Sequence, residues 1–419
     1  MTRELEYDVV IAGGGTAGVA AAVASAGTGA RTVLIERNAY LGGEATHSMI
    51  TAFCGFYASG HPPVKAVAGV GDLVLEQLGK LGQETGYEIS ASGSATVKFH
   101  PEYLKYALDL LTEEQGVDVL FHSRITSVQR NGGSIESVEC ADDAGCFRIT
   151  GKAFVDATGD ANLAFLSGAE TVWGSSDGRT QAATLAFMID RIGGCGDITP
   201  GAIERAVLQA KRAGITCLTK EKGFIIRRGN ADYGYVLLPS AELTGLDAAS
   251  LTAAEQDTRR QAHAYVEAFR RYMPGMEQCR LMQTGPGIGI RESRKLAGRY
   301  TLCAADVLEA RKRPDGIGRG AWRPEIHRDI NKMGEYLKVE EGSYYDIPLA
   351  ALQSADTDNL YGAGRVIAAD DVAFASARVM GTCFVTGQGA GTGAAMQALG
   401  KGGSIDSIRQ ELLRQGALL

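Results

Sequence analysis

Residues 7–36 read YDVVIAGGGTAGVAAAVASAGTGARTVLIE, and this stretch decides the fold. The segment 7–12 is short, apolar and β-branched, which predicts a buried strand. A helix is expected over the alanine-rich residues 19–25, and 32–35 predicts a second buried strand that ends at Glu36. Strand, Gly-Gly-Gly-Thr-Ala-Gly turn, helix, strand and acid together form the context in which G-x-G-x-x-G binds a dinucleotide. We therefore predict a dinucleotide-binding unit at the start of the sequence.

The glycines of this turn have separate physical purposes. Gly13 allows the tight turn, Gly15 lets backbone approach a pyrophosphate, and Gly18 lets the helix pack closely on the strand. The helix N-terminus then offers free N–H groups and a positive dipole end to phosphates. Glu36 follows Gly13 by 36 − 13 = 23 residues, close to the ~20 expected of a ribose-binding acid. The alternatives are a packing turn with a surface glutamate, or a membrane span over the uncharged residues 9–27, against which five glycines argue.

Composition and charge narrow the class of protein. A chain of 419 residues can bury a large core and is expected to form two domains. Glycine is heavily used, at 55 of 419 residues, about twice the average of roughly 7%. This suits an α/β fold with many close backbone approaches. A formal net charge of −7 and the lack of any Lys/Arg-rich run argue against a nucleic-acid partner.

The eight cysteines are scattered and form no C-x-x-C pair. Neither a zinc site nor a cysteine-ligated iron–sulfur cluster is therefore expected, and we predict no metal site. We see no cleavable signal before the first strand. Cysteines in such a chain are mostly buried thiols of a reducing compartment. We expect a cytoplasmic protein without a membrane span.

Further strands and helices are expected after Glu36. Alternating apolar residues and turn dipeptides predict an antiparallel meander of four strands, over 117–120, 125–128, 135–138 and 147–149. A separate strand over 153–156 ends at a small-residue turn, where the carboxyl edge of a sheet meets a ligand. Amphipathic helices are expected over 72–81 and 102–114.

From about 173 to 348 the sequence lacks the strands and glycine-rich turns typical of a nucleotide-binding fold, and these features reappear after that interval. The interval is expected to contain a helix over 203–213, a strand over 233–238 and a long helix over 253–272. The part after it is expected to contain a strand over 359–365, a helix of small residues over 378–400 and a final helix over 405–413. We predict a first domain in two parts, 1–172 and 351–419, interrupted by a second domain over 173–350.

Taken together, these stretches resemble the FAD-dependent oxidoreductases of the glutathione-reductase/succinate-dehydrogenase superfamily, and most closely the FAD-oxidored family. The resemblance covers most of the chain and rests on GGGTAG at 13–18, Glu36, Gly42-Gly43, DATGD at 156–160, GIRESRKLAGRYTL at 289–302, NLYGAGR at 359–365 and the run 378–391. It implies an α/β fold: a Rossmann-like FAD-binding domain of the GR2 type, interrupted by an inserted α+β substrate or cap domain.

The resemblance also implies which residues hold FAD, which we expect to be bound non-covalently. Glu36 would bind the adenosine ribose, Ile125 would offer its backbone to adenine, and Gly364-Arg365 would meet the ribityl chain. The helix that begins near Met380 would stabilise the negative charge that a hydride leaves on the flavin pyrimidine. The full set is Gly13, Gly15, Thr16, Ala17, Gly18, Glu36, Arg37, Gly42, Gly43, Glu44, Ile125, Ala157, Thr158, Gly159, Gly364, Arg365, Val379 and Met380.

Four residues are candidates for the substrate site, namely Arg291, Arg294, His327 and Arg378. Arginine offers a bidentate fork for a carboxylate, and histidine titrates near neutral pH. The alternative for the Arg291–Arg294 segment is a structural network of ion pairs at the domain interface. The alternative for His327 is a non-catalytic histidine.

The favoured function is an FAD-dependent oxidoreductase that transfers a hydride between a small polar or anionic substrate and flavin N5. The alternatives are a flavin monooxygenase that uses NAD(P)H and oxygen, an FAD-binding subunit that passes electrons to a partner protein, and an RNA-modifying flavoenzyme. No second G-x-G-x-x-G lies between a strand and a helix, which counts against a dedicated nicotinamide domain. The electron acceptor, a covalent link to flavin and a homo-oligomeric assembly are left open.

Overall fold

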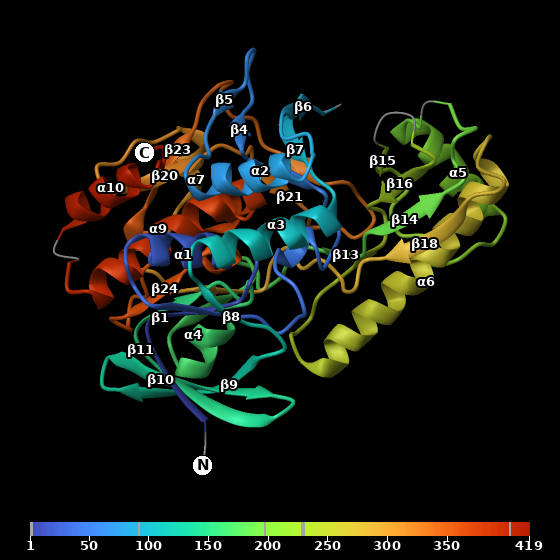
Figure 1. Ribbon diagram of the computed structural model, residues 1–419. Coiled ribbons are helices and arrows are strands. Elements are labelled where there is room, and N and C mark those ends of the chain that lie inside the picture. The colour runs from blue at the N-terminus through green and yellow to red at the C-terminus, as the bar shows by residue number, and fades with distance from the viewer. Residues whose placement is uncertain (1–2, 91–92, 197, 228–230, 402–403) are drawn as a thin grey trace.

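The computed structural model describes residues 3–90, 93–196, 198–227, 231–401 and 404–419. Its centre is a seven-stranded sheet in the order β8-β2-β1-β11-β10-β9, with β24 beside the carboxyl-terminal part of β11 (Figure 1). Its strands are β1 (Arg3–Ala12), β2 (Thr32–Ile35), β8 (Asp118–Leu120), β9 (Arg124–Asn131), β10 (Ser134–Asp142), β11 (Gly145–Asp156) and β24 (Leu360–Gly362). Strands β8, β2, β1, β11 and β24 are parallel to one another, whereas the β11–β10 and β10–β9 pairs are antiparallel. The predicted Rossmann-like α/β class is confirmed.

Two of the strand predictions are wrong. The segment 117–120 does not belong to the meander, because β8 lies parallel to β2 with Asp118 opposite Val33. Alternation shows which side of a strand is buried, but it does not identify the neighbouring strand. The strands expected over 147–149 and 153–156 are one strand, β11, which pairs with β10 in its first half and with β24 in its second.

The carboxyl ends of the parallel strands meet at one edge of the sheet. Ala12 lies opposite both Ile35 and Asp156, and Asp156 lies opposite Gly362. The turns that follow β1, β2, β11 and β24 are therefore neighbours, although up to 350 residues separate them along the chain (362 − 12). This edge is where open α/β sheets bind their ligands.

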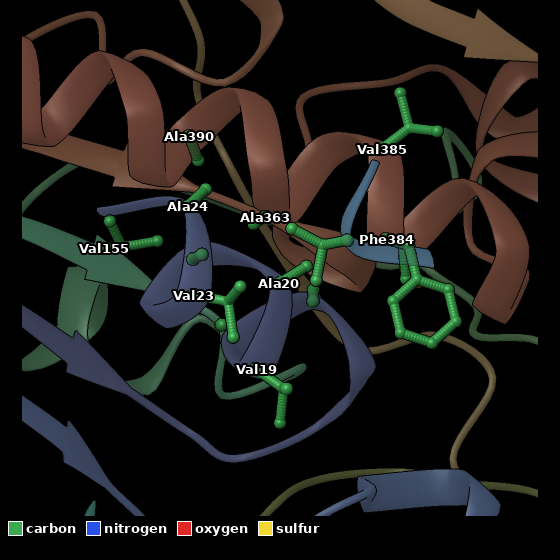
Figure 2. Close-up of a cluster of buried hydrophobic side chains, with 14 of the residues drawn as sticks. Val19, Ala20, Val23, Ala24, Val155, Ala363, Phe384, Val385 and Ala390 are labelled. Atoms are coloured by element: carbon green, nitrogen blue, oxygen red, sulfur yellow. The ribbon is translucent and has the colours of Figure 1, made fainter. Parts of the chain in front are cut away.

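Helices α1 (Thr16–Gly27) and α9 (Met380–Ala398) pack against each other over one face of the sheet. A methyl group at Gly387 or Gly391 would overlap the backbone oxygen of Ala17 or Ala21, so the two helix backbones touch. Figure 2 shows part of the apolar cluster between them, with Val19, Ala20, Val23, Ala24, Val155, Ala363, Phe384, Val385 and Ala390 labelled. The small residues of both helices are explained by this close approach.

Other helices pack on the two faces of the main sheet. Apolar side chains of α2 (Val70–Lys80) and α3 (Pro101–Glu114) belong to the same cluster as α1 and α9, which confirms the helices expected there. Leu163 and Ala164 of α4 (Asn162–Ser167) pack with Val10 and Val33 on the opposite face. The remaining helices of this part are α7 (Ala304–Leu308), α8 (Asp371–Ala377) and α10 (Ile405–Arg414).

A second layer of structure lies beside the main sheet (Figure 1). It contains a four-stranded sheet in the order β15-β16-β14-β18, with α5 (Pro200–Arg212) and α6 (Ala248–Tyr272) packed on it around Phe187, Tyr265 and Phe269. Its strands are β14 (Phe187–Asp190), β15 (Ile225–Ile226), β16 (Tyr233–Val236) and β18 (Arg280–Thr284). The helices expected over 203–213 and 253–272 are confirmed, and each begins three to five residues earlier than expected, at an N-cap Thr or Asp.

The short elements connect these layers. They are β3 (Ala52–Cys54), β4 (Tyr57–Ala58), β5 (Val64–Lys65), β6 (Tyr87–Ile89), β7 (Ala95–Lys98), β12 (Thr171–Trp173), β13 (Ala183–Thr184), β17 (Ser240–Ala241), β19 (Arg294–Leu296), β20 (Gly316–Gly320), β21 (Glu325–Ile326), β22 (Glu335–Tyr336), β23 (Tyr345–Pro348), η1 (Gly43–Ala45), η2 (Leu349–Ala351) and η3 (Gly364–Val366). Leu302, Ile317 and Ile347 pack into the core of the main sheet, and the domain limits at 173 and 350 stay a prediction. In the part of the chain that the structure describes, no helix is both long and apolar enough to cross a membrane.

Candidate functional site

In the turn between β1 and α1, Gly13, Gly14 and Gly18 leave no room for a side chain, whereas Gly15 faces open space. Gly13 has a φ of 96°, and a Cβ there would lie 2.6 Å from the carbonyl oxygen of Ala157. A Cβ at Gly18 would overlap the carbonyl oxygen of Gly13. By contrast, the nearest atom to a Cβ at Gly15 is Gly43 Cα, at 3.8 Å. Gly15 therefore lines a cradle that a ligand can enter.

This cradle ends at the N-terminus of α1. Gly15 is the N-cap of the helix, and neither a capping side chain nor an acidic residue in the first turn occupies its N–H groups. The first helical hydrogen bond runs from Val19 N to Gly15 O, at 2.9 Å. The N–H groups of Thr16, Ala17 and Gly18 precede it and are available to an anion.

Glu36 is buried beside the glycine turn, 6% exposed. Its Oε2 accepts the backbone N–H of Gly14 at 2.7 Å, and its Oε1 accepts the backbone N–H of Asn38 at 2.8 Å. A carboxylate oxygen can accept more than one hydrogen bond, so Glu36 can also receive ribose hydroxyls. Arg37, the next residue, is exposed.

The segment that precedes Ile125 lies at the same edge of the main sheet. Ser123 donates its backbone N–H to Glu36 O at 3.1 Å, two residues before Ile125. Ile125 itself lies opposite Cys140 near the start of β9, beside a register shift in the β9–β10 pair. The structure thus brings the Ile125 segment next to Glu36.

The pair Gly42-Gly43 runs beside the glycine turn, and Glu44 follows it. Gly42 donates its N–H to Gly14 O at 2.8 Å. Arg365 joins this turn to the turn after β11, because its guanidinium lies 3.3 Å from Glu44 Oε1 and 3.3 Å from Asp160 Oδ1. Burial opposes the charge of Arg365, but the two carboxylates outweigh it and raise its pKa.

The turn 157–159 is built on the buried Asp156. Its Oδ1 accepts from Thr158 N at 3.0 Å and from Thr158 Oγ1 at 2.7 Å, and its Oδ2 accepts from Ala164 N at 2.8 Å. Burial raises the pKa of Asp156. Gly159 is packed against the Arg365 side chain. This network places the segment of Ala157, Thr158 and Gly159 directly above Gly13 and in contact with Arg365.

The N-terminus of α9 completes the edge. Gly364 donates its N–H to Thr386 Oγ1 at 3.0 Å, which holds the turn after β24 against the helix. Val379 is the N-cap and Met380 the first helical residue, with no capping side chain and no acid in the first turn. Among the described residues, Thr382 Oγ1 is buried without a hydrogen-bond partner. A polar group without a partner at a helix N-terminus fits a ligand with acceptor atoms.

Comparisons with known proteins show the family to which the chain belongs. The family model described as FAD dependent oxidoreductase matches residues 8–416, so the chain belongs to that family. A geranylgeranyl bacteriochlorophyll reductase-like protein from Thermoplasma acidophilum has a similar structure, with a TM-score of 0.50 and 13% identity, over 99% of this chain and 84% of that chain. BexE, studied for oxidation during BE-7585A biosynthesis, is similar over 98% of this chain and 66% of its own, with a TM-score of 0.50 and 13% identity. At such identity the likeness shows the fold alone. None of the curated proteins matches the sequence.

The chain is therefore an FAD-dependent oxidoreductase. The open cradle at Gly15, the free N-termini of α1 and α9, and the buried carboxylate of Glu36 fit a dinucleotide cofactor. Most of the cofactor residues implied by the resemblance lie in the turns that follow β1, β2, β11 and β24 or at the N-terminus of α9. Arg37, whose side chain is exposed, directly follows Glu36. The individual contacts of these residues to FAD stay predictions.

Three of the four substrate-site candidates form a cluster next to the N-terminus of α9, in which His327 is buried and Arg291 and Arg378 are half-buried. Arg291 donates Nη1–H to Ala182 O at 2.6 Å and to Thr184 Oγ1 at 2.7 Å. Arg378 donates Nη2–H to Glu325 O at 2.9 Å, and its Nε is buried without a partner within the described chain. His327 lies between them, with its backbone N–H on Gln181 Oε1 at 3.2 Å.

The charges of this cluster are set by burial and by each other. Burial and the charge of Arg291 lower the pKa of His327 to about 3, so its ring is neutral. Burial alone would raise the pKa of Glu325, but the hydrogen bond from His327 and the charge of Arg378 lower it to about 2. His327 Nε2 lies 3.1 Å from Glu325 Oε1, which assigns the ring proton to Nε2. Nδ1 is then a buried acceptor, and none of the described residues donates to it.

Arg294 lies elsewhere. Its Nε donates to Asp160 O at 3.0 Å and its Nη2 to Asn162 Oδ1 at 2.6 Å, and its guanidinium lies 4.1 Å above the Phe165 ring. Three residues along an extended chain place side chains on opposite faces, so Arg291 and Arg294 point apart. Arg294 therefore binds the segment that follows the 157–159 turn.

Sequence reasoning missed two charged members of the cluster. Glu325 is the partner of His327, and Lys220 is 4% exposed and interacts electrostatically with Arg291 and Glu325. Neither belongs to a motif, and Lys220 lies in a polar loop between α5 and β15. The burial of Lys220 is visible only in the packed structure, where the second layer lies against the site.

Proposed function

We propose that this oxidoreductase transfers a hydride between FAD and a small anionic substrate, a 2-hydroxy acid or its 2-oxo product. When bound, FAD accepts or returns the hydride. The chain's own residues would bind the carboxylate, exclude water and provide an acceptor for the hydroxyl hydrogen. This function rests on the cluster of Arg291, His327 and Arg378.

One observation carries the proposal. Arg291 and Arg378 are both half-buried, yet their described hydrogen bonds go to carbonyl, hydroxyl and amide oxygens rather than to carboxylates. The charge of Glu325 acts on both of them, and Glu44 and Glu292 each act on one. Glu44 is paired with Arg365 and Glu292 with Lys295, so neither is a dedicated partner of these two arginines. Burial lowers the pKa of both arginines. The pKa of Arg291 falls to about 10, so this side chain stays charged at neutral pH. A carboxylate would supply the missing charge and a bidentate acceptor.

His327 and Thr382 each have a buried polar atom that would suit a hydroxyl or carbonyl oxygen of the substrate. His327 Nδ1 offers a lone pair, and Thr382 Oγ1 can donate or accept. A Cβ at Gly55 would lie 2.7 Å from the Val379 side chain and 3.2 Å from Thr382 Oγ1, so the Gly55 backbone packs against one side of the first turn of α9. The site therefore combines a place for an anion with neutral polar groups beside it.

The test is anaerobic reduction of the flavin by a panel of 2-hydroxy acids in four proteins. R291M and R378M are expected to raise the substrate concentration needed for half-maximal reduction about 10- to 100-fold, the loss of a charge-assisted hydrogen bond of about 1.5–3 kcal/mol. R280M is the control, because Arg280 is exposed and bonds Asp190 on the second sheet. If all four proteins need the same substrate concentration for half-maximal flavin reduction, the proposal is wrong.

The same samples address the other functions. Reduction by NADPH with oxygen uptake and hydroxylated product, but not by hydroxy acids, would establish a monooxygenase. Reduction that needs an added iron–sulfur or flavodoxin-like protein would establish an electron-transfer subunit. The physiological electron acceptor and a homo-oligomeric state stay open predictions.

A further inference from the structure

Trp322 is a buried tryptophan whose indole N–H finds no hydrogen-bond partner in the described chain. The residue is 6% exposed, and none of the described residues accepts from its Nε1. A buried tryptophan usually finds a partner for this group. Indole Nε1 can only donate, so the missing partner is an acceptor atom. A ligand that carries such an atom would remove the cost of burying the N–H group.

The backbone of Trp322 is held beside the segment that leads into α9. Ser376, near the end of α8, donates Oγ–H to Trp322 O, and its Oγ lies 2.9 Å from the hydroxyl oxygen of Tyr345. Arg378 donates Nη2–H to Glu325 O at 2.9 Å. Residues 322–325 therefore lie beside residues 376–378, which directly precede the N-cap of α9.

The side chain of Trp322 begins next to the first turn of α9. A Cβ at Gly55 would lie 3.5 Å from Trp322 Cβ and 3.2 Å from Thr382 Oγ1. Thr382 Oγ1 is also buried and also lacks a partner among the described residues. Two side chains with unsatisfied polar atoms therefore lie around one point, at the N-terminus of a helix of 19 residues. Such a helix end itself attracts negative charge.

The N-terminus of α9 lies next to the cofactor cradle. The first helical hydrogen bond of α9 runs from Cys383 N to Val379 O at 2.9 Å, so the N–H groups of residues 380–382 have no partner within the helix. A Cβ at Gly364 would lie 2.9 Å from Ala17 Cβ of α1 and 3.5 Å from Cys383 Sγ of α9. The first turns of both helices therefore meet at Gly364. A dinucleotide with its phosphates at α1 can place its other end at α9.

We propose that Trp322 donates its indole N–H to the pyrimidine part of the flavin ring and thereby raises the reduction potential of bound FAD. A hydride taken up by flavin leaves negative charge on this part of the ring, and donors fixed beside it stabilise reduced FAD more than oxidised FAD. Arg291 and Arg378 offer charged donors for a substrate anion, whereas Trp322 and the helix N-terminus offer neutral donors for a charge that is spread over a ring. The inference concerns the cofactor and does not depend on the substrate of the proposed function.

The first measurement uses the fact that the chain has two tryptophans, Trp173 and Trp322. W173F protein therefore has one indole, and NMR of this protein labelled with 15N-tryptophan shows a single indole N–H resonance. We expect this resonance to move downfield when FAD is added to the apoprotein, because a new hydrogen bond forms.

The second measurement is the midpoint potential of bound FAD, from anaerobic titration against a reference dye without substrate. W322F keeps an aromatic ring and loses the donor. Reduced FAD should therefore bind about 10-fold more weakly relative to oxidised FAD, on the scale of a hydrogen bond to a charged group. This change is a fall of about 30 mV in the potential. W173F, which alters the half-buried Trp173 on β12, is the control and should keep the wild-type potential.

An indole resonance of W173F that does not change with FAD overturns the inference, and so does a W322F potential equal to that of the wild type. A resonance that moves only when oxalate, a dicarboxylate that does not reduce flavin, is added to the FAD-loaded protein places the indole at the substrate and also overturns it. If W322F does not fold, the W173F titration decides. Failure of every hydroxy acid to reduce the flavin would refute the proposed function and leave both measurements in place.

Discussion

Gly14 donates its backbone N–H to Glu36 Oε2 over 2.7 Å, so the acid that ends β2 also fixes the glycine turn that ends β1. The same carboxylate accepts Asn38 N through its other oxygen. Glu36 therefore shapes the cofactor cradle before any ribose reaches it. An acid that follows the second strand of such a unit has a structural role as well as a binding one.

The first prediction concerns this carboxylate. E36A should weaken FAD binding about 10- to 100-fold, because a charge-assisted hydrogen bond of about 1.5–3 kcal/mol to the turn is lost. The FAD affinity of E36Q, which keeps one acceptor oxygen, should lie between those of the wild type and E36A. Fluorescence titration of the apoprotein with FAD measures both, and E113Q on the exposed side of α3 is the control. Unchanged affinity in E36A would refute this role.

The second prediction contrasts two glycines of the turn. In G18A the new methyl group would overlap Gly13 O, so the protein should unfold at lower temperature or fail to accumulate. G15A has 3.8 Å to the nearest atom and a φ of −68°, so the apoprotein should fold normally. Its FAD affinity should nevertheless fall at least 10-fold, since the methyl group enters the cradle. Thermal unfolding of the apoproteins and FAD titration measure the two effects. A destabilised G15A protein with normal FAD affinity would contradict the assignment of Gly15 to the cofactor cradle.

Local patterns made the first unit predictable, because strand, turn, helix and acid lie within 30 residues. The substrate cluster was less accessible to prediction. Arg291, His327 and Arg378 are separated by 36 and 51 residues, and their meeting depends on how α8 and β21 pack. Arg294 shares a motif with Arg291, yet the extended backbone turns it to the other side. Lys220 has no motif at all, because burial of a single lysine is a property of the packed layers.

The third prediction is acid sensitivity caused by His327. The pKa of His327 is lowered, so between its unfolded value near 6.5 and its folded value of about 3 the unfolded chain binds the extra proton. Stability should therefore fall as the pH falls through this window. H327Q should flatten the loss between pH 6.5 and 5, above the range where Glu325 titrates. Urea unfolding at the two pH values measures the free energy of unfolding. An equal loss of this free energy in wild type and H327Q would count against a buried neutral ring at His327.

The fourth prediction concerns stability at Lys220. Its pKa is lowered from 10.5 to about 7, so from pH 7 to 10.5 the unfolded chain holds more protons and stability should rise with pH. K220M removes the buried amine and should stabilise the protein at pH 7 by roughly 2–4 kcal/mol, on the scale of 1.36 kcal/mol per pKa unit. The gain should vanish near pH 10.5. Urea unfolding of K220M and of the control K222M, which alters an exposed lysine on the same loop, at both pH values is the measurement, and a destabilised K220M at pH 7 would contradict it.

The most direct measurement compares a 2-hydroxy acid with its own amide as reductants of the flavin. The two molecules share the carbon and hydroxyl that react and differ only in the charge that Arg291 and Arg378 are proposed to bind. Anaerobic absorbance of the purified holoprotein follows the bleaching of the flavin band with each member of a lactate, malate and 2-hydroxyglutarate series. We predict that at least one acid bleaches the flavin 100-fold or more faster than its amide. Equal rates for acids and amides, or bleaching by NADPH alone, would contradict an anionic substrate at this site.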